Sequence, residues 1–319
     1  MERAQRNTKV AGIDVGKFWL DVAIHGRDGT RRFANDEAGL TGLAVWLAEE
    51  GVVRAGLEAT AGYERAARSR LEAEGVQVIV HQPLEVRLFA RLKRWKAKTD
   101  RLDAVLIAAA TVQVEAVRAA RDPLLVELAQ RLTAYEHITD KVADLKTFME
   151  HVDLPDLVER LGQEIGRLSR LKVRLASDIL ARIKARPDLL ARYRLLLSLP
   201  GVGPIVAASL LIRMPELGAM RRGQPAALLG VAPLDRQSGQ WRGRSVIGGG
   251  RARPRRMLYL AAIAAKRCDP GFKAFAERLI QAAKPPKVAI VAVMRKLIEA
   301  ANLVLQRQQP WTAQTVPTT

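Results

Sequence analysis

Residues 9–26, KVAGIDVGKFWLDVAIHG, begin with a short apolar run and continue after one turn into a second apolar segment. Short apolar runs bounded by glycine indicate buried strands. The turn GRDG at 26–29 and the segment TRRFAND at 30–36 extend the pattern to a third strand. The stretch therefore predicts a three-stranded meander at the start of a sheet.

Strands and helices alternate after this meander. Two helical patterns (38–50 and 62–75) and two strand patterns (VVRAGLEAT, 52–60, and VQVIVHQP, 76–83) precede a further helix at 99–113, TDRLDAVLIAAATVQ. The order of three strands, helix, strand, helix and strand, followed by helices, predicts an α/β domain over residues 1–118.

Residues 119–188 are predicted to form a spacer of two long helices, because apolar residues recur there with heptad-like spacing on both sides of HVDLPDL (151–157). The hairpin could pack on its own domain, or it could project as an arm that joins protomers. A mostly helical domain over 189–308 and a flexible tail over 309–319 complete the predicted organisation.

The charge balance favours a polyanionic partner. The chain of 319 residues has 52 Lys+Arg and 33 Asp+Glu, a net charge of +19. From Arg182 onward there are 24 Lys+Arg against six Asp+Glu, so nearly the whole excess lies in the C-terminal part. Nucleic acid is the first expectation for such a partner.

Several classes of protein are disfavoured by the sequence. No uncharged apolar run of about 18 residues is present, and the start MERAQRNTKV has no signal-peptide core, so we expect a cytoplasmic, nucleoid-associated protein without a membrane partner. The single Cys268 excludes an intrachain disulfide. The four histidines show no zinc-ligand spacing.

Four acids form the first candidate site. Asp14 lies in the middle of an apolar strand, and Glu58 ends another. Asp100 and Asp103 lie three residues apart, on one face of a predicted helix. Four carboxylates would gather only around a cation, and hard oxygen ligands select Mg²⁺, with Mn²⁺ as an alternative. Such ions serve phosphodiester chemistry.

Each acid also has an ordinary explanation. An acid at a strand end can be a cap or a member of an ion pair. Thr99 could cap the predicted helix, and the two aspartates near its first turn would favour its dipole. The segment GIDVGK (12–17) also invites comparison with sugar kinases and actin-like ATPases. Those proteins need a second phosphate loop with an acid, and the glycine run 248–250 has none, so this interpretation is disfavoured.

Basic and glycine-rich segments form the candidate nucleic-acid interface. Lys93, Arg94, Lys96 and Lys98 precede the helix that carries Asp100. In LPGVGP (199–204), Gly201 and Gly203 would let backbone N–H groups approach phosphates. An ordinary turn between two helices is the alternative for this segment.

A serine lies among arginines in the C-terminal half. Ser238 belongs to a segment that also contains the aromatic Trp241. The segment contains seven arginines: Arg236, Arg242, Arg244, Arg251, Arg253, Arg255 and Arg256. Arginine forks bind phosphates, and Trp241 could stack on a base. Composition alone favours an ordinary turn serine.

Taken together, these motifs resemble the IS110-family transposases along essentially the whole chain. The family has an RNase H-like, RuvC-type α/β domain with a DEDD set of acids, a helical coiled-coil spacer, and a mostly α-helical C-terminal domain with a serine before an arginine-rich segment. Carried over, the acids fall on Asp14, Glu58, Asp100 and Asp103, and the serine falls on Ser238. Ser245 lies close enough to remain an alternative.

The resemblance implies a recombinase that exchanges strands of donor and target DNA through a phosphoserine link. It also implies a guide (bridge) RNA as partner, and a tetramer in which protomers share a site. No histidine follows His151, so the base for Ser238 would be a metal ion, one of the four acids or Asp235. Two alternatives remain: a RuvC-like nuclease that activates water, and a non-catalytic nucleic-acid scaffold.

Overall fold

The computed structural model describes residues 9–94, 100–114, 122–234, 237–238, 241–242 and 246–312. For residues 100–102, 237–238 and 241–242 the description covers the backbone only. The chain divides into two compact units, Met1–Ala120 and Arg121–Thr319. Some residues singled out in the sequence lie outside the described residues: Lys96, Lys98, Asp235, Arg236, Arg244 and Ser245.

The first unit is built on a five-stranded mixed sheet with the order β3-β2-β1-β4-β5. Its strands are β1 (Lys9–Val15), β2 (Trp19–Ile24), β3 (Arg31–Ala34), β4 (Val52–Glu58) and β5 (Gln77–His81). The strands β1, β2 and β3 form the antiparallel meander, and β4 and β5 continue parallel to β1. This arrangement is RNase H-like, so the predicted fold class is confirmed.

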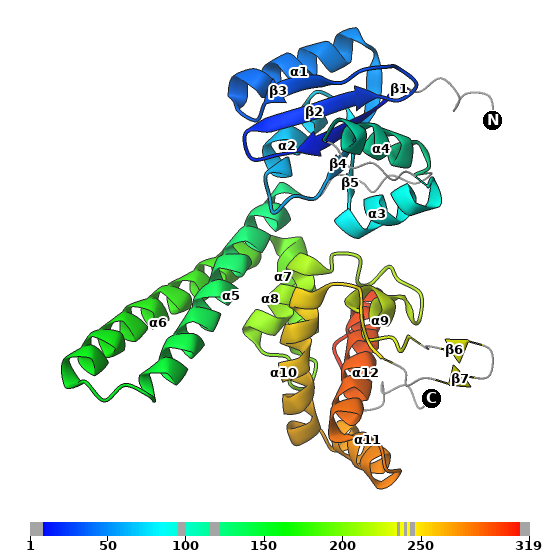
Figure 1. Cartoon of the computed structure of the whole chain (residues 1–319). Helices are drawn as coiled ribbons and strands as arrows, with labels where there is room; N and C mark the ends of the chain where they lie inside the picture. Colours follow the sequence, from blue (N-terminus) through cyan, green and yellow to red (C-terminus); the bar gives the residue numbers. More distant parts are fainter. Residues whose placement is uncertain are drawn as a thin grey trace. The chain divides into compact units, whose positions relative to one another are not determined.

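The two faces of the sheet carry different helices (Figure 1). Helices α1 (Glu37–Glu49) and α2 (Glu64–Ala73) pack on the face that carries Ile13, Leu20 and Leu57, and form one hydrophobic core with it. Helix α4 (Asp100–Val112) packs across β1, β2 and β4, and α3 (Pro83–Leu92) packs on α4. Since side chains alternate along a strand, α4 covers the other face.

The second unit begins with a helical hairpin, α5 (Pro123–Met149) and α6 (Pro155–Lys184). Leu128, Leu132, Ile179 and Ile183 at the base of the hairpin are buried in the same core as the C-terminal helices. The far end of the hairpin extends away from those helices (Figure 1). The hairpin therefore packs on its own unit at its base and projects at its far end. The joining of protomers by this arm and a separate spacer domain over 119–188 stay predictions.

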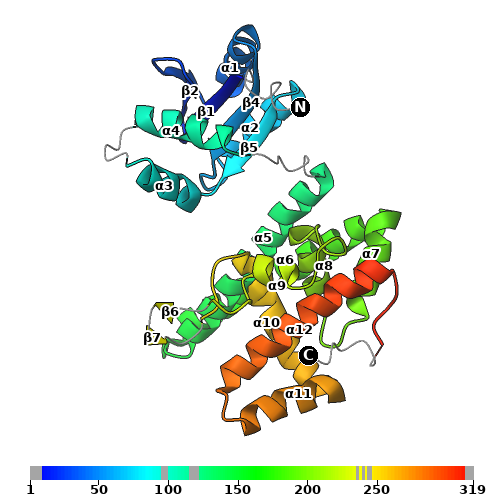
Figure 2. The same ribbon diagram turned by 90° about the vertical axis from the view of Figure 1, so that its right-hand side faces the viewer.

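The C-terminal helices pack around one hydrophobic core. They are α7 (Pro187–Leu197), α8 (Pro204–Arg213), α9 (Gln224–Leu229), α10 (Ala252–Cys268), α11 (Pro270–Gln281) and α12 (Pro286–Arg307). Helices α10, α11 and α12 pack on one another (Figure 2). Between α9 and α10 lies a short hairpin, β6 (Gln237–Ser238) and β7 (Trp241–Arg242).

None of the helices in the described part of the chain has the length and apolar character needed to cross a membrane.

Candidate functional site

The sheet face beneath α4 carries the first two predicted acids. A Cβ on Gly12 would overlap the backbone of Ala104 and Ala108, and a Cβ on Gly56 would overlap the Thr111 hydroxyl, so both glycines face α4. Asp14 and Glu58 lie two residues further along the same strands and therefore on the same face. Gly12 pairs with Gly56 in the parallel register, which places Asp14 beside Glu58.

Polar side chains continue on both sides of these acids. Asp14 pairs with Asp21 on β2, and Asp21 pairs with Arg32 on β3. Glu58 pairs with His81 on β5. The residues Arg32, Asp21, Asp14, Glu58 and His81 thus form one row across the sheet, here called the polar row. Neighbouring members have Cβ atoms about 5 Å apart.

Asp21 was not identified from the sequence. It is buried, and Arg32 holds it with two hydrogen bonds, from Nε to Oδ1 at 2.9 Å and from Nη2 to Oδ2 at 2.8 Å. A bidentate guanidinium compensates a carboxylate that would otherwise be costly to bury. The signal in the sequence is the acid in WLDVAI (19–24), which interrupts an apolar strand as Asp14 does.

His81 was also missed, because its role depends on strand register rather than on spacing. Thr111 Oγ1 donates its one hydrogen to the Ile107 carbonyl at 2.6 Å, so His81 Nε2 is the donor in its 2.8 Å hydrogen bond to Thr111 Oγ1. Burial lowers the pKa of His81 below its ordinary 6.5, and the Glu85 carboxylate partly opposes this shift. A neutral imidazole therefore ends the polar row beside Glu58.

The other two predicted acids lie on α4. Asp103 immediately precedes Ala104, whose carbonyl lies over Gly12, and Asp100 is the first residue of the helix. The side chain of Asp100 is outside the described residues. Among the side chains that are described, no three histidines, cysteines or acids lie close enough to form a metal-binding group. The structure thus brings Asp14 and Glu58 to one face, beneath the helix that carries the aspartates.

Asn35 connects the loops that follow the two acid-bearing strands. Its Nδ2 donates to the carbonyls of Gly16 at 3.0 Å and Tyr63 at 3.2 Å, while its backbone N–H donates to Phe18 at 2.8 Å. The aromatic side chains of Phe18 and Tyr63 are exposed. One amide thereby fixes the β1–β2 turn against the loop after β4, at the edge where the acids lie.

The predicted basic run before α4 is described in part. Lys93 and Arg94 follow α3 directly and are exposed, with the Lys93 ammonium 5.6 Å from the centre of the Phe89 ring. Exposed cations next to the acid-bearing helix suit phosphate contacts. Their contact with nucleic acid stays a prediction.

Gly201 has a packing role in the structure. Its φ is +73°, and a Cβ there would overlap the backbone of Ala261 and Ala265 on α10. Gly203 is the N-cap of α8, with φ −81° and open space around its Cα. The turn therefore lets α10 pack closely against residue 201, and phosphate contacts at Gly201 and Gly203 stay predictions.

The predicted serine lies in the β6–β7 hairpin. Ser238 pairs with Trp241, and Gln237 pairs with Arg242, in antiparallel register. Their side chains are outside the described residues. The flanking residues Leu234 and Val246 form a β-bridge with hydrogen bonds of 2.8 and 3.2 Å in both directions.

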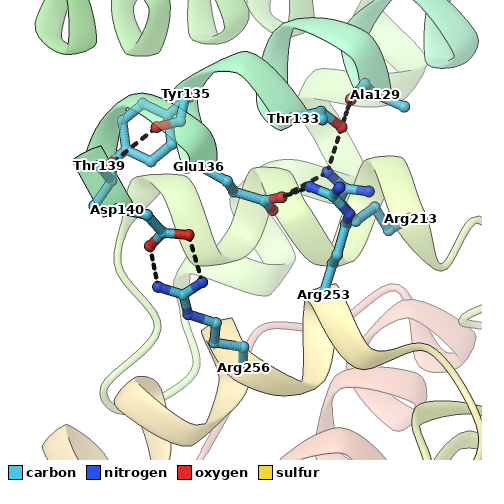
Figure 3. Close-up of polar contacts among 9 residues, drawn as sticks. All are labelled: Ala129, Thr133, Tyr135, Glu136, Thr139, Asp140, Arg213, Arg253 and Arg256. Carbon is cyan, nitrogen blue, oxygen red and sulfur yellow. Dashed lines mark hydrogen bonds and ion pairs between the residues drawn. The ribbon is translucent and has the colours of Figure 1, made fainter. Parts of the chain in front are cut away.

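Four of the predicted phosphate-binding arginines contact groups of the protein itself. Arg253 Nη1 donates to Glu136 at 2.6 Å, and Arg256 forms a two-bond pair with Asp140 (Figure 3). Arg251 forms a two-bond pair with Glu216. Arg255 donates to backbone carbonyls. These contacts bind α10 to α5 and α8, so any phosphate contact by these side chains must compete with them.

Glu136 lies at the centre of the α5–α10 contact. It also accepts from Arg213 Nη2 at 3.0 Å, and Arg213 Nη2 donates to Thr133 Oγ1 at 3.1 Å (Figure 3). Burial lowers the pKa of Arg213, and the Glu136 carboxylate opposes this shift. One half-buried carboxylate thus compensates two guanidinium groups from separate helices.

Comparison with known proteins gives matches in both halves. A family model described as an IS110 DEDD transposase matches residues 11–152, and the Transposase IS116/IS110/IS902 family model matches 193–277. The pilin gene-inverting proteins of Moraxella lacunata and Moraxella bovis are each 25% identical over 318 residues, covering 94% of this chain and 96% of theirs.

Among solved structures, T. thermophilus RuvC with a Holliday junction substrate is 14% identical and covers 33% of this chain and 92% of that chain, with a TM-score of 0.28. Another T. thermophilus RuvC structure is 14% identical and covers 32% and 92%, with a TM-score of 0.25. Because these TM-scores are low, the fold class rests on strand order and on the family matches.

The sheet topology defines an RNase H-like unit, which a helical unit follows, and the two family matches indicate a DNA-processing protein. The chain belongs to the IS110 family of transposases.

Proposed function

We propose that this transposase cuts and rejoins DNA strands through a covalent phosphoserine link at Ser238, served by the acids Asp14, Glu58, Asp100 and Asp103. The observation that carries the proposal is the polar row, in which Asp14 and Glu58 lie side by side beneath the helix that bears the two aspartates. Half-buried carboxylates placed together at the ends of neighbouring strands suit a site for divalent ions.

The donor set fits Mg²⁺, with Mn²⁺ as the alternative, because all four side chains offer hard oxygen ligands. Asp14 and Glu58 would hold the ion from the sheet, and Asp100 and Asp103 from α4. Bound there, divalent ions would stabilise the negative charge of a phosphodiester in transfer.

The proposed reaction has two balanced steps. The Ser238 oxygen forms a bond to phosphorus, the bond from phosphorus to one strand oxygen breaks, and the serine proton ends on that leaving oxygen. In the second step a hydroxyl of the new strand attacks the phosphoserine and returns the proton to Ser238. A serine hydroxyl needs a base, which we assign to the acidic site or to Asp235.

The proposal is tested by measuring, on a denaturing gel, the amount of DNA that becomes covalently linked to the protein. We expect protein-linked DNA with the natural chain, none with Ser238→Ala, and a strong loss with Asp14→Asn or Asp100→Asn. Ser245→Ala should keep the adduct and serves as the matched control. A full yield of adduct with Asp100→Asn would contradict the role of the acids.

The partners of the proposed reaction are double-stranded donor and target DNA and a guide RNA. A structured RNA encoded beside the gene should co-purify with the protein, and its removal should abolish target choice. We also propose a homo-oligomer, a dimer of dimers, bound to DNA in the nucleoid. The exposed apolar residues Phe148, Leu154 and Val173 on the hairpin support association.

RuvC-like hydrolysis is the second candidate, and it is favoured by the same polar row. It predicts nicked DNA without a protein link, and activity that survives Ser238→Ala. A non-catalytic scaffold predicts neither product and no effect of Mg²⁺ on thermal stability.

A further inference from the structure

The two ends of the segment that carries Ser238 lie together. We name residues 231–250 the serine loop. At its base, the N–H of Arg251 donates to the Leu228 carbonyl at 2.9 Å, and the Leu234–Val246 bridge lies just inside. The loop is therefore closed at its base by backbone hydrogen bonds that do not involve β6 or β7.

One side chain joins both ends of this loop. Arg255, in the first turns of α10, donates from Nη1 to the carbonyls of Gly249 at 2.6 Å, Gly230 at 3.3 Å and Leu229 at 3.4 Å. Leu229 and Gly230 end α9, where carbonyls lack helical partners and a cation is favoured. Gly249 is at the other end of the loop.

Glycine is required on both sides of this contact. A Cβ on Gly250 would overlap Gly230 N and Leu228 O, and a Cβ on Gly230 would overlap Gly249 O and Arg255 Nη1. The φ angles of Gly230 and Gly250 are +81° and +59°. The two chain ends therefore lie too close together for a side chain at either glycine, and the Arg255 guanidinium lies beside them.

Arg251 fixes the same end of the loop to a second helix. Its Nη1 donates to the Arg213 carbonyl at the end of α8 at 2.6 Å, and its two terminal nitrogens pair with Glu216 at 2.7 and 2.6 Å. The C-terminal end of the loop is thus bound to both α8 and α9. The base of the serine loop is therefore fixed to the helices of the second unit.

We infer that Arg255 is a positioning residue that closes the base of the serine loop and so sets the place of Ser238, rather than a contact to DNA phosphate. The inference rests on the proposed function of Ser238. A nucleophile reacts well only when held close to its target in a narrow range of positions. Joining the two ends of the serine loop at a fixed base reduces the number of positions that Ser238 can occupy.

The test compares Arg255→Ala with Arg192→Ala in the full chain. Arg192 is a matched control, because its Nη2 also donates to two backbone carbonyls, Pro215 and Leu217, both at 2.9 Å, in the same unit. Three quantities are measured: the rate of covalent adduct formation, the salt dependence of DNA binding, and hydrogen exchange of peptides 228–234 and 246–251.

For Arg255→Ala we expect at least a tenfold lower adduct rate, faster exchange in both peptides, and an unchanged salt slope of DNA binding. Arg255→Lys should restore part of the rate, because an ammonium can still donate to carbonyls. Arg192→Ala should lower thermal stability without the tenfold rate loss.

Two results would overturn the inference. The first is a salt slope smaller by about one with unchanged exchange, since this marks a lost phosphate contact. The second is an equal loss of rate in Arg192→Ala. If the natural chain forms no adduct, the proposed function fails, but exchange and salt slope still decide the role of Arg255.

Discussion

At the scale of single residues, the polar row determines which charged groups lie next to the candidate acids Asp14 and Glu58. Asp14 lies between Asp21 and Glu58 in this row, and like charges on neighbouring positions disfavour one another. Arg32 compensates Asp21, and a neutral His81 lies beyond Glu58. In the row, Asp14 and Glu58 thus lie between a carboxylate held by a guanidinium and a neutral imidazole.

Replacing Arg32 tests this balance. Arg32→Ala leaves Asp21 without its bidentate partner beside Asp14, so we expect a loss of roughly 1–3 kcal/mol in the free energy of unfolding. Saturating Mg²⁺ should recover more stability in this variant than in the natural chain. Denaturant unfolding with and without Mg²⁺ measures both effects.

Arg31→Ala is the control for that experiment, because Arg31 is on the same strand but faces the rings of Phe33 and Trp46 on the other side of the sheet. It should keep the natural response to Mg²⁺. The double variant Asp21→Asn/Arg32→Ala should also lose the extra response, and a persistent response there would contradict the role of Asp21.

His81 should make stability depend on pH. Its folded pKa lies below its ordinary 6.5, so the unfolded state binds the proton more readily. Its contribution is fully present above pH 6.5 and is lost as the pH falls from there through the lowered pKa of the folded state. His81→Gln should flatten that part of the profile of melting temperature against pH. The exposed His25 provides the control, and an equal flattening with His25→Gln would refute the assignment.

At the scale of elements, glycines set how closely helices approach their neighbours. Gly12 and Gly56 let α4 lie directly on the sheet beside Asp14 and Glu58, and Gly201 does the same for α10 at the turn before α8. The motifs GIDVG and LPGVGP therefore have packing reasons independent of phosphate binding. Close approach is what places helix α4, which carries Asp103, over the strands that carry Asp14 and Glu58.

The variants Gly201→Ala and Gly203→Ala test whether Gly201 is needed for close helix packing. Alanine at 201 must adopt a positive φ and overlaps α10, so we expect a loss of roughly 2–4 kcal/mol in stability. Alanine at 203 meets open space and should cost less than about 1 kcal/mol. Urea midpoints measure both, and equal midpoints would argue against the close packing at Gly201.

The ion pairs between α5 and α10 act at the same scale. Glu136 and Asp140 on α5 meet Arg253 and Arg256 on α10 (Figure 3). The pairs differ in exposure, because the Glu136 side chain is 12% exposed and the Arg256 side chain is 66% exposed. The Arg253–Glu136 pair is thus the less exposed of the two, and the Arg256–Asp140 pair is more open to exchange with phosphate.

For the whole molecule, the proposed chemistry needs groups from two separate compact units. The acids belong to Met1–Ala120, and Ser238 belongs to Arg121–Thr319. A site shared between protomers predicts complementation: Asp14→Asn mixed with Ser238→Ala should form adduct, although neither variant does so alone. Adduct yield after mixing and reassembly measures this, and a mixture as inactive as its components would favour a site within one protomer.

The sequence by itself determined the order of strands and helices, the acids at strand ends and on α4, and the charge of the C-terminal part. Local apolar periodicity and glycine turns carry that information, because they depend on near neighbours in the chain. Only the tertiary structure placed Asp21, Arg32 and His81 in one row with Asp14 and Glu58, since strand register joins residues far apart in sequence. It also assigned Arg251, Arg253, Arg255 and Arg256 to contacts within the protein, because an arginine's partner depends on which carboxylate or carbonyl the fold brings within reach.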